Sequence, residues 1–303
     1  MKKIASVFLI AVSFAVMLFT SASADTVSAG TYYYDQLSEN EKKAYDRMVN
    51  AAMNSNTRDV GLTDFDVYYD SFERASDAFI MDVGPIDINI NSCSFTYYIQ
   101  NNLVSKFHIV YNGRSSDEQE RFEQAAADVV LEAQKKRTDY DKLKFLHDWL
   151  VNHSNYVYSS DNIDAAFADG PVVRGIGNCN GYTRAFYYFA RSLGFECICV
   201  YGTAGGGGHA WNMVKLDGEW YNVDVTWDDR GLQNDYKIYY NYFLKSDAVF
   251  NRDHTPDGGY VYPTAHKNYK KSLNPIPLLI AAGVAAVVAM ILLWRKMKRE
   301  DYY

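Results

Sequence analysis

Three side chains in this sequence could together perform nucleophilic chemistry: the thiol of Cys179, the imidazole of His209 and the carboxylate of Asp224. A cysteine thiolate attacks carbonyl carbon atoms, a neighbouring imidazole transfers the proton, and a carboxylate holds that imidazole in orientation. Taken singly, a cysteine is more often a small buried apolar residue and a histidine a structural one. Their occurrence together, in segments that can converge, indicates a cysteine-dependent catalytic centre.

The segment around Cys179 is typical of a loop that enters a helix. Residues 174–181 are rich in glycine and asparagine, and Gly194 supplies a stop signal. Between them, apolar residues recur at the spacing of one helix face: Tyr182, Ala185, Phe186, Phe189, Ala190 and Leu193. We therefore expect Cys179 at or near a helix N-terminus, where unpaired N–H groups and the macrodipole favour the thiolate.

His209 and Asp224 belong to a predicted β-hairpin. Residues 209–215 form the first strand, Asp217-Gly218 the turn, and residues 220–227 the returning strand. Because side chains alternate between the two faces of a sheet, a two-residue turn places His209 and Asp224 on one face. They would be diagonal neighbours, about 7–8 Å apart at the backbone and within reach of each other's side chains. The predicted fold is α+β, with the nucleophile helix packed on an antiparallel sheet.

The motifs around these residues resemble a known family. They are Gly177-Asn-Cys-Asn-Gly-Tyr-Thr-Arg-Ala-Phe186, Leu193-Gly-Phe-Glu-Cys197 and His209-Ala-Trp-Asn-Met-Val-Lys-Leu-Asp-Gly-Glu-Trp-Tyr-Asn-Val-Asp-Val-Thr-Trp-Asp228. Together they look like the core of the transglutaminase-like superfamily. The segment 140–151 resembles the helix that precedes this core, and 242–247 followed by His254 resembles its closing segment.

The resemblance implies a papain-like catalytic centre. In it, Cys179 would be the nucleophile, His209 the general base and acid, and Asp224 the group that orients the imidazole. Asn180 stands where bacterial members often carry an acidic residue, and the approach to His209 is unusually rich in glycine. The three expected residue types are nevertheless all present.

A thioester on Cys179 could be resolved by several acceptors. An amine would give transamidation, and water would give deamidation or amide cleavage. The leading prediction is a cell-surface cysteine acyltransferase or amidase that acts on protein or cell-wall peptide. The alternatives are a cysteine peptidase on the same triad, and a non-catalytic surface adhesion or assembly module. The backbone N–H of Cys179 is the first expected donor to an oxyanion.

The two ends of the chain predict a location. Residues 1–24 have a basic start, an apolar run and a small-residue site before Asp25, as in a signal peptide. Residues 275–294 carry no charge and are long enough to cross about 30 Å of hydrocarbon. The basic segment 295–303 would be a cytoplasmic tail, which leaves the catalytic domain outside the cell on a single-pass membrane anchor.

Composition agrees with one moderate extracellular region. The 303 residues include 30 Lys and Arg against 37 Asp and Glu, a net charge of −7, so nucleic acid is an improbable partner. We expect a small α+β N-terminal region at 25–113 and a catalytic domain at 114–272. Within them, Ser38-Glu-Asn-Glu41 and Ser116-Asp-Glu-Gln119 should open helices, and residues 64–111 should be mostly strands.

No metal or cofactor site is predicted. His147 and His153 are poorly spaced for a shared ion, and the chain has no HExxH motif, so solvated or packing roles are favoured. The acidic pair Asp228-Asp229 is typical of a solvated turn. Three cysteines outside the predicted centre leave the disulfide status open, with buried packing favoured for the last two: Cys93, Cys197 and Cys199.

Overall fold

The computed structural model describes seven stretches of the chain: 32–53, 59–87, 93–111, 115–158, 160–229, 238–271 and 287–291. It divides into a unit at 1–268 and a second unit at 269–303, of which the structure describes residues 269–271 and a helical piece at 287–291. The predicted signal peptide lies outside the described residues, as does the predicted membrane helix at 275–294 except for 287–291. Within the described stretches, no helix is both long and apolar enough to span a membrane.

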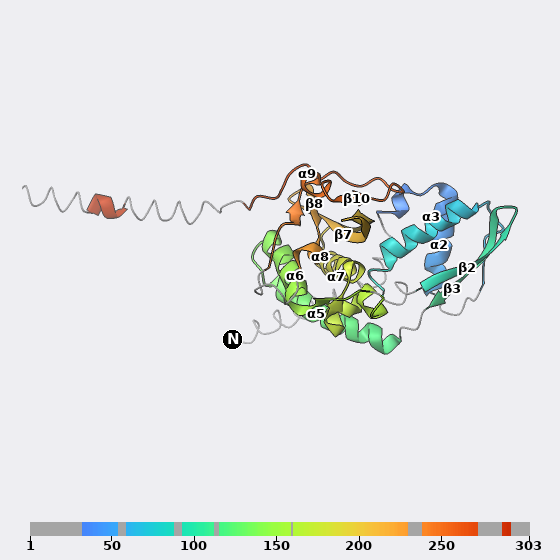
Figure 1. The fold of residues 1–303 in the computed structure, drawn as a ribbon, viewed down its shortest axis with the longest axis horizontal. Helices are drawn as coiled ribbons and strands as arrows, with labels where there is room; N and C mark the ends of the chain where they lie inside the picture. Colours follow the sequence, from blue (N-terminus) through green and yellow to red (C-terminus); the bar gives the residue numbers. More distant parts are fainter. Residues whose placement is uncertain are drawn as a thin grey trace, which may run out of the picture. The chain divides into compact units, whose positions relative to one another are not determined.

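The N-terminal part of the first unit packs two helices on a small sheet (Figure 1). The helices are α2 (Glu39–Met53) and α3 (Tyr69–Val83), and the antiparallel strands are β1 (Val60–Gly61), β3 (Leu103–Tyr111) and β2 (Cys93–Gln100), in that order across the sheet. Its core is aromatic, with ring centroids 5.5–6.0 Å apart among Phe72, Phe79, Phe95 and Phe107. The predicted small α+β region is therefore a packed structure with its own core.

The prediction of mostly strands at 64–111 is wrong in its first half, where α3 lies. The buried residues of α3 include Phe72, Ala75, Phe79 and Val83, which recur every three to four positions. This is the helical period, and it decides the structure although the segment is rich in aromatic residues. The two later strands lie where they were expected, joined by a turn at Asn101-Asn102 with positive φ at both residues.

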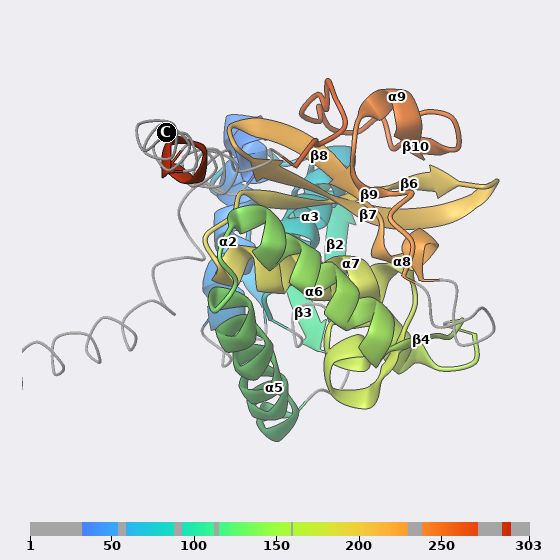
Figure 2. The ribbon, with the colours of Figure 1, turned by 90° about the vertical axis from the view of Figure 1, so that its left-hand side faces the viewer.

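The remainder of the first unit places helices on an antiparallel sheet (Figures 1 and 2). The helices are α5 (Ser116–Gln134), α6 (Asp139–His153) and α7 (Cys179–Ser192). The five strands run in the order β10 (His254–Pro256), β6 (Cys197–Ala204), β7 (Gly207–Leu216), β8 (Glu219–Val223) and β9 (Phe243–Lys245). Shorter elements connect these: η1 (Tyr34–Gln36), β4 (Asn155–Tyr156), η2 (Ile163–Ala166), η3 (Gly170–Arg174), β5 (Ile176–Gly177), α8 (Val225–Asp228) and α9 (Asp247–Phe250).

The two faces of this sheet are covered by different elements. On one face, the Asn212 amide donates to the Thr183 carbonyl oxygen of α7 at 3.0 Å. On the other face, Val200 and Trp211 pack with Phe250 of α9. Neighbouring residues of β6 and β7 therefore point to opposite layers, as the two-residue period of a strand requires. The predicted α+β architecture, with the helix bearing Cys179 against an antiparallel sheet, is confirmed.

Helix caps explain where the outer helices begin. Ser115, not Ser116, caps α5: its side chain accepts from the Glu118 N–H, and the Glu118 carboxylate accepts from the Ser115 N–H at 2.9 Å. The helix predicted to open at Ser116 does begin there, with a capping box formed by Ser115 and Glu118. Thr138 caps α6 in the same way by accepting from the Asp141 N–H at 3.1 Å. Both helices start where a side chain satisfies an otherwise unpaired donor.

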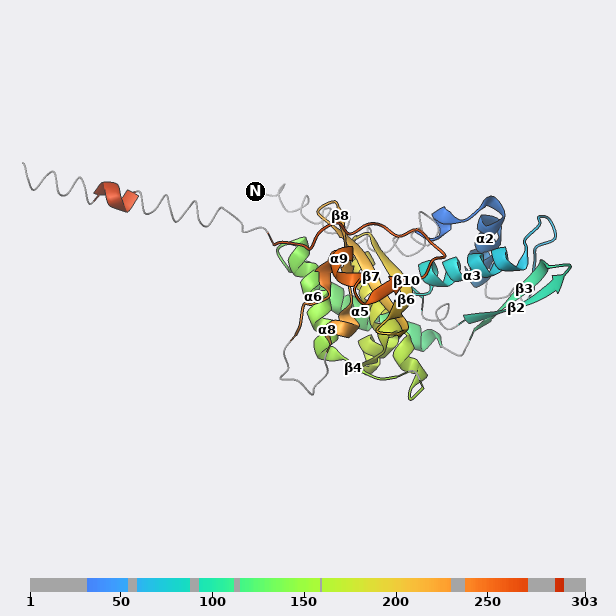
Figure 3. The same ribbon diagram turned by 45° about the horizontal axis from the view of Figure 1, so that its top comes forward.

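The segment after β10 ties the two parts of the first unit together (Figure 3). The Tyr260 hydroxyl donates to the Arg74 carbonyl oxygen at 2.9 Å, and the Val261 N–H donates to Gln36 at 2.8 Å. From the N-terminal side, the buried Tyr33 hydroxyl donates to the Cys199 carbonyl oxygen of β6. These contacts couple the N-terminal part to the sheet that carries His209.

Candidate active site

Cys179 is the first residue of α7, as the sequence predicted. The turn before it is held by Asn178, which is buried and accepts from the Gly181 N–H at 3.2 Å as the helix cap. The Asn178 N–H donates to the Ala165 carbonyl oxygen at 2.8 Å. A side chain at position 181 would collide with that same oxygen, so only glycine fits there. The thiol is thus presented at a helix start on a tightly fixed turn.

The hairpin register agrees with the prediction up to the end of β8. Asp217 and Gly218 form the turn with φ of 53° and 81°, and Asn212 pairs with Val223. The returning strand ends there, however, and does not reach Trp227 as expected. Asp224 instead caps the short helix α8. A carboxylate that accepts an N–H at a helix start ends the strand pairing, because the cap residue leaves the ladder.

His209 and Asp224 meet in spite of this change. The His209 Nε2 lies 2.7 Å from the Asp224 Oδ2, and both side chains are buried, at 8% and 1% exposure. Since the carboxylate takes Nε2, the other ring nitrogen, Nδ1, is the one left to interact with Cys179, which contributes to the raised pKa of His209. The three residues predicted from the sequence therefore converge in the order thiol, imidazole, carboxylate.

The electrostatics of His209 favour the protonated ring. Burial by itself lowers the pKa of His209, but the hydrogen bonds to Asp224 and Cys179 and the attraction of their charges outweigh it. The result is a pKa raised to about 9. An imidazole with this pKa carries its proton at neutral pH, which suits a group that must later give a proton to a leaving amine.

Asp224 is the most heavily coordinated carboxylate of the site. Its Oδ1 accepts from the Trp227 N–H at 3.1 Å, and its Oδ2 accepts from His209 and also from His254 Nε2, at 3.0 Å. Burial opposes ionisation of Asp224, yet the two imidazole donors hold its pKa below the usual value. Asp224 is therefore a buried carboxylate kept ionised by donors on both oxygens.

His254 is the site residue that sequence reasoning missed. It lies on β10, 30 positions after Asp224, and reaches the site because β10 pairs with β6. The chain offered one signal, since His254 falls in the segment that resembles the end of the family core. No local periodicity or spacing connected it to Asp224.

Two exposed tyrosines lie on or next to β4, which pairs with the residues just before Cys179. Tyr156 and Tyr158 are 39% and 66% exposed, and their rings meet edge to face at 5.3 Å. Burial raises the pKa of Tyr156, and this residue pairs with Gly177, two positions before Cys179.

The same cluster contains a set of possible metal ligands. One ligand atom each from His209, Asp224 and His254 lies within 4.8 Å of the others. However, both Nε2 atoms are already hydrogen-bonded to the Asp224 Oδ2. A metal ion would have to replace these two bonds, so the arrangement fits a proton-transfer site better than a metal site.

The other predicted features have mixed outcomes. Cys93, Cys197 and Cys199 are free thiols, and the last two are buried, as packing predicts. His147 is fully buried and faces Asp228 at 3.3 Å. The expectation of a solvated turn at Asp228 is wrong, because its Oδ1 accepts from the backbone N–H groups of Asn241 and Tyr242 at 2.8 and 3.1 Å.

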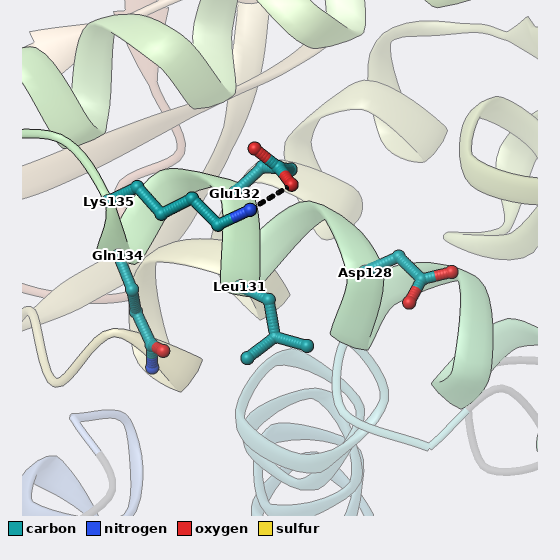
Figure 4. A pocket seen from close by; sticks show the side chains of 5 residues that line it. All are labelled: Asp128, Leu131, Glu132, Gln134 and Lys135. Atoms are coloured by element: carbon teal, nitrogen blue, oxygen red, sulfur yellow. Dashed lines mark hydrogen bonds and ion pairs between the residues drawn. The ribbon is translucent and has the colours of Figure 1, made fainter.

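A separate hollow lies on the outer side of α5 (Figure 4). One helix supplies all of its lining residues, which are Asp128, Leu131, Glu132, Gln134 and Lys135. Glu132 and Lys135 pair with each other across it, and Leu131 is 55% exposed. It contains no nucleophile and no imidazole, so the candidate chemistry belongs to Cys179 and its partners.

Part of the chain is similar to known proteins. The family model of the transglutaminase-like superfamily matches residues 124–225. Kyphoscoliosis peptidase of Homo sapiens is 30% identical over 155 residues, covering 45% of this chain and 23% of that protein. The Mus musculus protein of the same name is 32% identical over 152 residues, covering 43% and 22%. The chain spans about a quarter of the length of these curated relatives.

Solved structures show a weaker likeness. The crystal structure of a TGase aligns with a TM-score of 0.36 and 16% identity, over 50% of this chain and 47% of that one. The periplasmic domain of TgpA from Pseudomonas aeruginosa aligns with a TM-score of 0.29 and 15% identity, over 46% and 66%. The family match confirms the resemblance in the motifs around Cys179 and His209: residues 124–225, about a third of the chain, match the transglutaminase-like superfamily.

Proposed function

We propose that this protein is a cell-surface cysteine acyltransferase or amidase that acts through a thioester on protein or cell-wall peptide amides. The observation that carries the proposal is the position of the His209 ring. Its Nε2 is fixed on Asp224 at 2.7 Å while its other nitrogen faces the Cys179 thiol. A thiol, an imidazole and a buried carboxylate in this order can activate a nucleophile and return its proton.

The first half of the reaction consumes the proton held on His209. The Cys179 sulfur attacks the amide carbon, and the carbonyl π electrons move onto oxygen. When the intermediate collapses, His209 gives its proton to the nitrogen, the C–N bond breaks, and an amine or ammonia leaves. The acyl group remains on sulfur as a thioester. The pKa of about 9 means that His209 holds this proton at neutral pH.

In the second half His209 acts as a base. It removes a proton from the acceptor, which attacks the thioester carbon, and the thiolate leaves. An amine acceptor gives a new amide, and water gives a carboxylic acid. Asp224 accepts a hydrogen bond from the Nε2–H of His209 in both halves and so keeps the reactive nitrogen turned toward the sulfur.

Charge on the carbonyl oxygen needs donors during both halves. The N–H of Cys179 lies in the first turn of α7, where such groups have no partner within the helix. It is suited to donate to the oxyanion. The exposed rings of Tyr156 and Tyr158 favour a substrate with an apolar side chain near the reacting amide.

A cysteine peptidase is the second candidate. The relatives with 30% and 32% identity are named kyphoscoliosis peptidase, and the same triad would cleave a chain if the leaving amine were part of its backbone. A third possibility is a non-catalytic adhesion or assembly module, for which an ordered triad would have no use.

One set of assays separates these functions. Purified full-length protein is incubated with dimethylcasein and dansylcadaverine, and the casein is analysed for bound fluorescence, deamidated glutamine and cut chains. Amine incorporation or deamidation supports the first proposal, and new chain termini support the peptidase. If neither product forms and an acyl-directed thiol probe does not label Cys179, the non-catalytic module is favoured. Cys179→Ala is the control, and surface proteins from cells with either form identify the natural substrate.

The location is part of the proposal and has its own test. A signal peptide at 1–24 and a membrane segment at 275–294 would leave the catalytic domain outside the cell. Protease added to intact cells should then release the domain, while a tag after Tyr303 stays protected. A tag that is digested in intact cells would reverse this orientation.

A further inference from the structure

A second imidazole contacts the carboxylate of the triad. The Nε2 of His254 lies 3.0 Å from the Asp224 Oδ2, the same oxygen that accepts from His209. Because an ionised carboxylate only accepts, both imidazoles donate to it. The triad is therefore extended by one residue on the side away from the thiol.

His254 is buried and has a polar partner at each ring nitrogen. Its side chain is fully buried, and its Nδ1 lies 2.6 Å from Asp253 Oδ1. The other oxygen of Asp253 accepts from the Tyr242 hydroxyl at 2.6 Å. Four aromatic rings surround the imidazole with centroids within 5.3 Å: Trp211, Trp227, Tyr242 and Phe250. In this orientation of the ring, Nε2 points at Asp224.

We propose that His254 is a positioning residue for the acyl-transfer reaction, which acts by fixing the Oδ2 of Asp224. This inference rests on the proposed function of Cys179. The Oδ1 of Asp224 is anchored by the Trp227 N–H, and His254 anchors the Oδ2 beside His209. A buried carboxylate with too few donors tends to take up a proton or rotate toward another donor, and either change would release Nε2 of His209.

If His254 had a purely structural role, its contact with Asp224 would serve to stabilise the turn at α8. As the cap of α8, Asp224 already accepts from the Trp227 N–H through its Oδ1. The fold of that turn therefore does not need a donor to the Oδ2 of Asp224. What the second donor adds is a defined direction for the bond to His209. This difference gives the experiment its design, because a donor that is not histidine should restore function.

The test compares His254→Phe with His254→Gln in the full-length protein. Iodoacetamide is the probe, and alkylation of Cys179 at pH 7 is followed by mass spectrometry and divided by the folded fraction. We expect alkylation to slow by about tenfold or more in His254→Phe, as for other residues that orient a reactive group. His254→Gln, whose amide can donate to the Oδ2, should stay within about threefold of wild type.

His147→Phe is the matched control. His147 is also fully buried and also contacts two carboxylates, but it does not touch Asp224. Its replacement should lower stability and leave the alkylation rate of folded protein unchanged. A wild-type rate in His254→Phe overturns the proposal, and so does an equal loss in His254→Gln and His254→Phe with an equal fall in melting temperature.

Two further measurements distinguish a failure of this proposal from a failure of the proposed function and from a metal site. If Cys179 in wild type reacts no faster than in His209→Ala, the proposed function itself fails, and the role of His254 with it. If EDTA removes the reactivity and zinc restores it, the cluster of His209, Asp224 and His254 is a metal site instead.

NMR gives a signature that a structural role would not produce. The chain has six histidines, so a sample labelled with ¹⁵N in histidine has few enough signals to assign by substitution. The Nε2 proton of His209 should keep its downfield position in His254→Gln and shift in His254→Phe. An unchanged His209 signal in His254→Phe would contradict the proposal.

Discussion

Two buried pairs of histidine and aspartate lie within the same domain and do different things. His209 and Asp224 are 2.7 Å apart, and His147 and Asp228 are 3.3 Å apart. In both, burial lowers the pKa of the imidazole but its partners raise it above the usual value. Pairing with a carboxylate therefore does not by itself mark a catalytic histidine.

The pairs differ in what the second ring nitrogen faces. In His147 the Nδ1 lies 3.2 Å from Asp148 Oδ1, so carboxylates take both nitrogens. In His209 one nitrogen is hydrogen-bonded to the carboxylate and the other faces the Cys179 thiol. An imidazole with a carboxylate at both nitrogens can only connect structural elements. An imidazole with one nitrogen directed to a thiol can transfer a proton.

The aspartates differ in the same sense. Burial raises the pKa of Asp228 although His147 and a backbone N–H oppose it, and its oxygens hold the backbone of residues 241–242. The pKa of Asp224 is lowered by its imidazole donors despite burial. One carboxylate organises a loop, and the other balances the charge of an active ring.

The largest loss of turnover should follow replacement of Cys179, the thiol that distinguishes the His209–Asp224 pair from the His147–Asp228 pair. Cys179→Ser is nearly isosteric, but a hydroxyl is a far weaker nucleophile at neutral pH, so turnover should fall by about a thousandfold or more. The melting temperature should stay close to that of wild type. Initial rates with dansylcadaverine and dimethylcasein measure the loss, and activity within tenfold of wild type would remove Cys179 from its role.

Asp224→Asn should have the next largest effect. The amide keeps the size of the carboxylate but can present a donor to His209, which favours the wrong tautomer. We expect turnover to fall by about a hundredfold to ten-thousandfold. Denaturant unfolding should show a much smaller relative change. If the variant instead unfolds, Asp224 is structural and the triad must be reassigned.

Asp228→Asn should reverse this pattern. The substitution leaves one acceptor oxygen for the N–H groups of Asn241 and Tyr242, and it places an amide against His147. We expect a loss of about 1–3 kcal/mol in the free energy of unfolding. Turnover per folded molecule should stay within about threefold of wild type, since no contact to Cys179 changes. Equal kinetic losses in the Asp224 and Asp228 variants would erase the distinction between the pairs.

The sequence predicted the parts of the site that depend on local signals. A two-residue turn at Asp217-Gly218 determines which residues of β7 and β8 are opposite, so His209 and Asp224 could be brought together without a structure. The helix start at Cys179 followed from a glycine-rich turn and an apolar period. In both cases, neighbouring residues determine the geometry.

The parts that were missed depend on contacts between distant segments. His254 reaches Asp224 only because β10 joins the edge of the sheet beside β6. Asp228 is buried because the backbone of residues 241–242 lies over it, 13 and 14 positions later. An acidic residue in a turn is normally solvated, and no spacing in the sequence shows that a loop will cover it.

The smallest predicted effect is a dependence of stability on pH. Both histidine–aspartate pairs should contribute to it, but only the pair of His209 should also make turnover depend on pH. His209 has a pKa raised to about 9, against about 6.5 in an unfolded chain. Its contribution to stability is therefore complete below about pH 6.5 and is lost as the pH rises through about 9. The pKa of His147 is also raised, so its contribution has the same sign. Urea unfolding at pH 6 and pH 9.5 should show this loss, and His209→Gln and His147→Gln should each make the difference smaller.

Turnover should separate the two histidines over the same range. Loss of the proton from His209 removes the acid that protonates the leaving amine, so the rate should fall above about pH 9 in wild type. His147→Gln should give the same pH profile per folded molecule, because its ring does not face the thiol. A rate that keeps rising through pH 9 would mean that the neutral ring limits the reaction as a base. The raised pKa of His209 would then serve stability alone, as it does in His147.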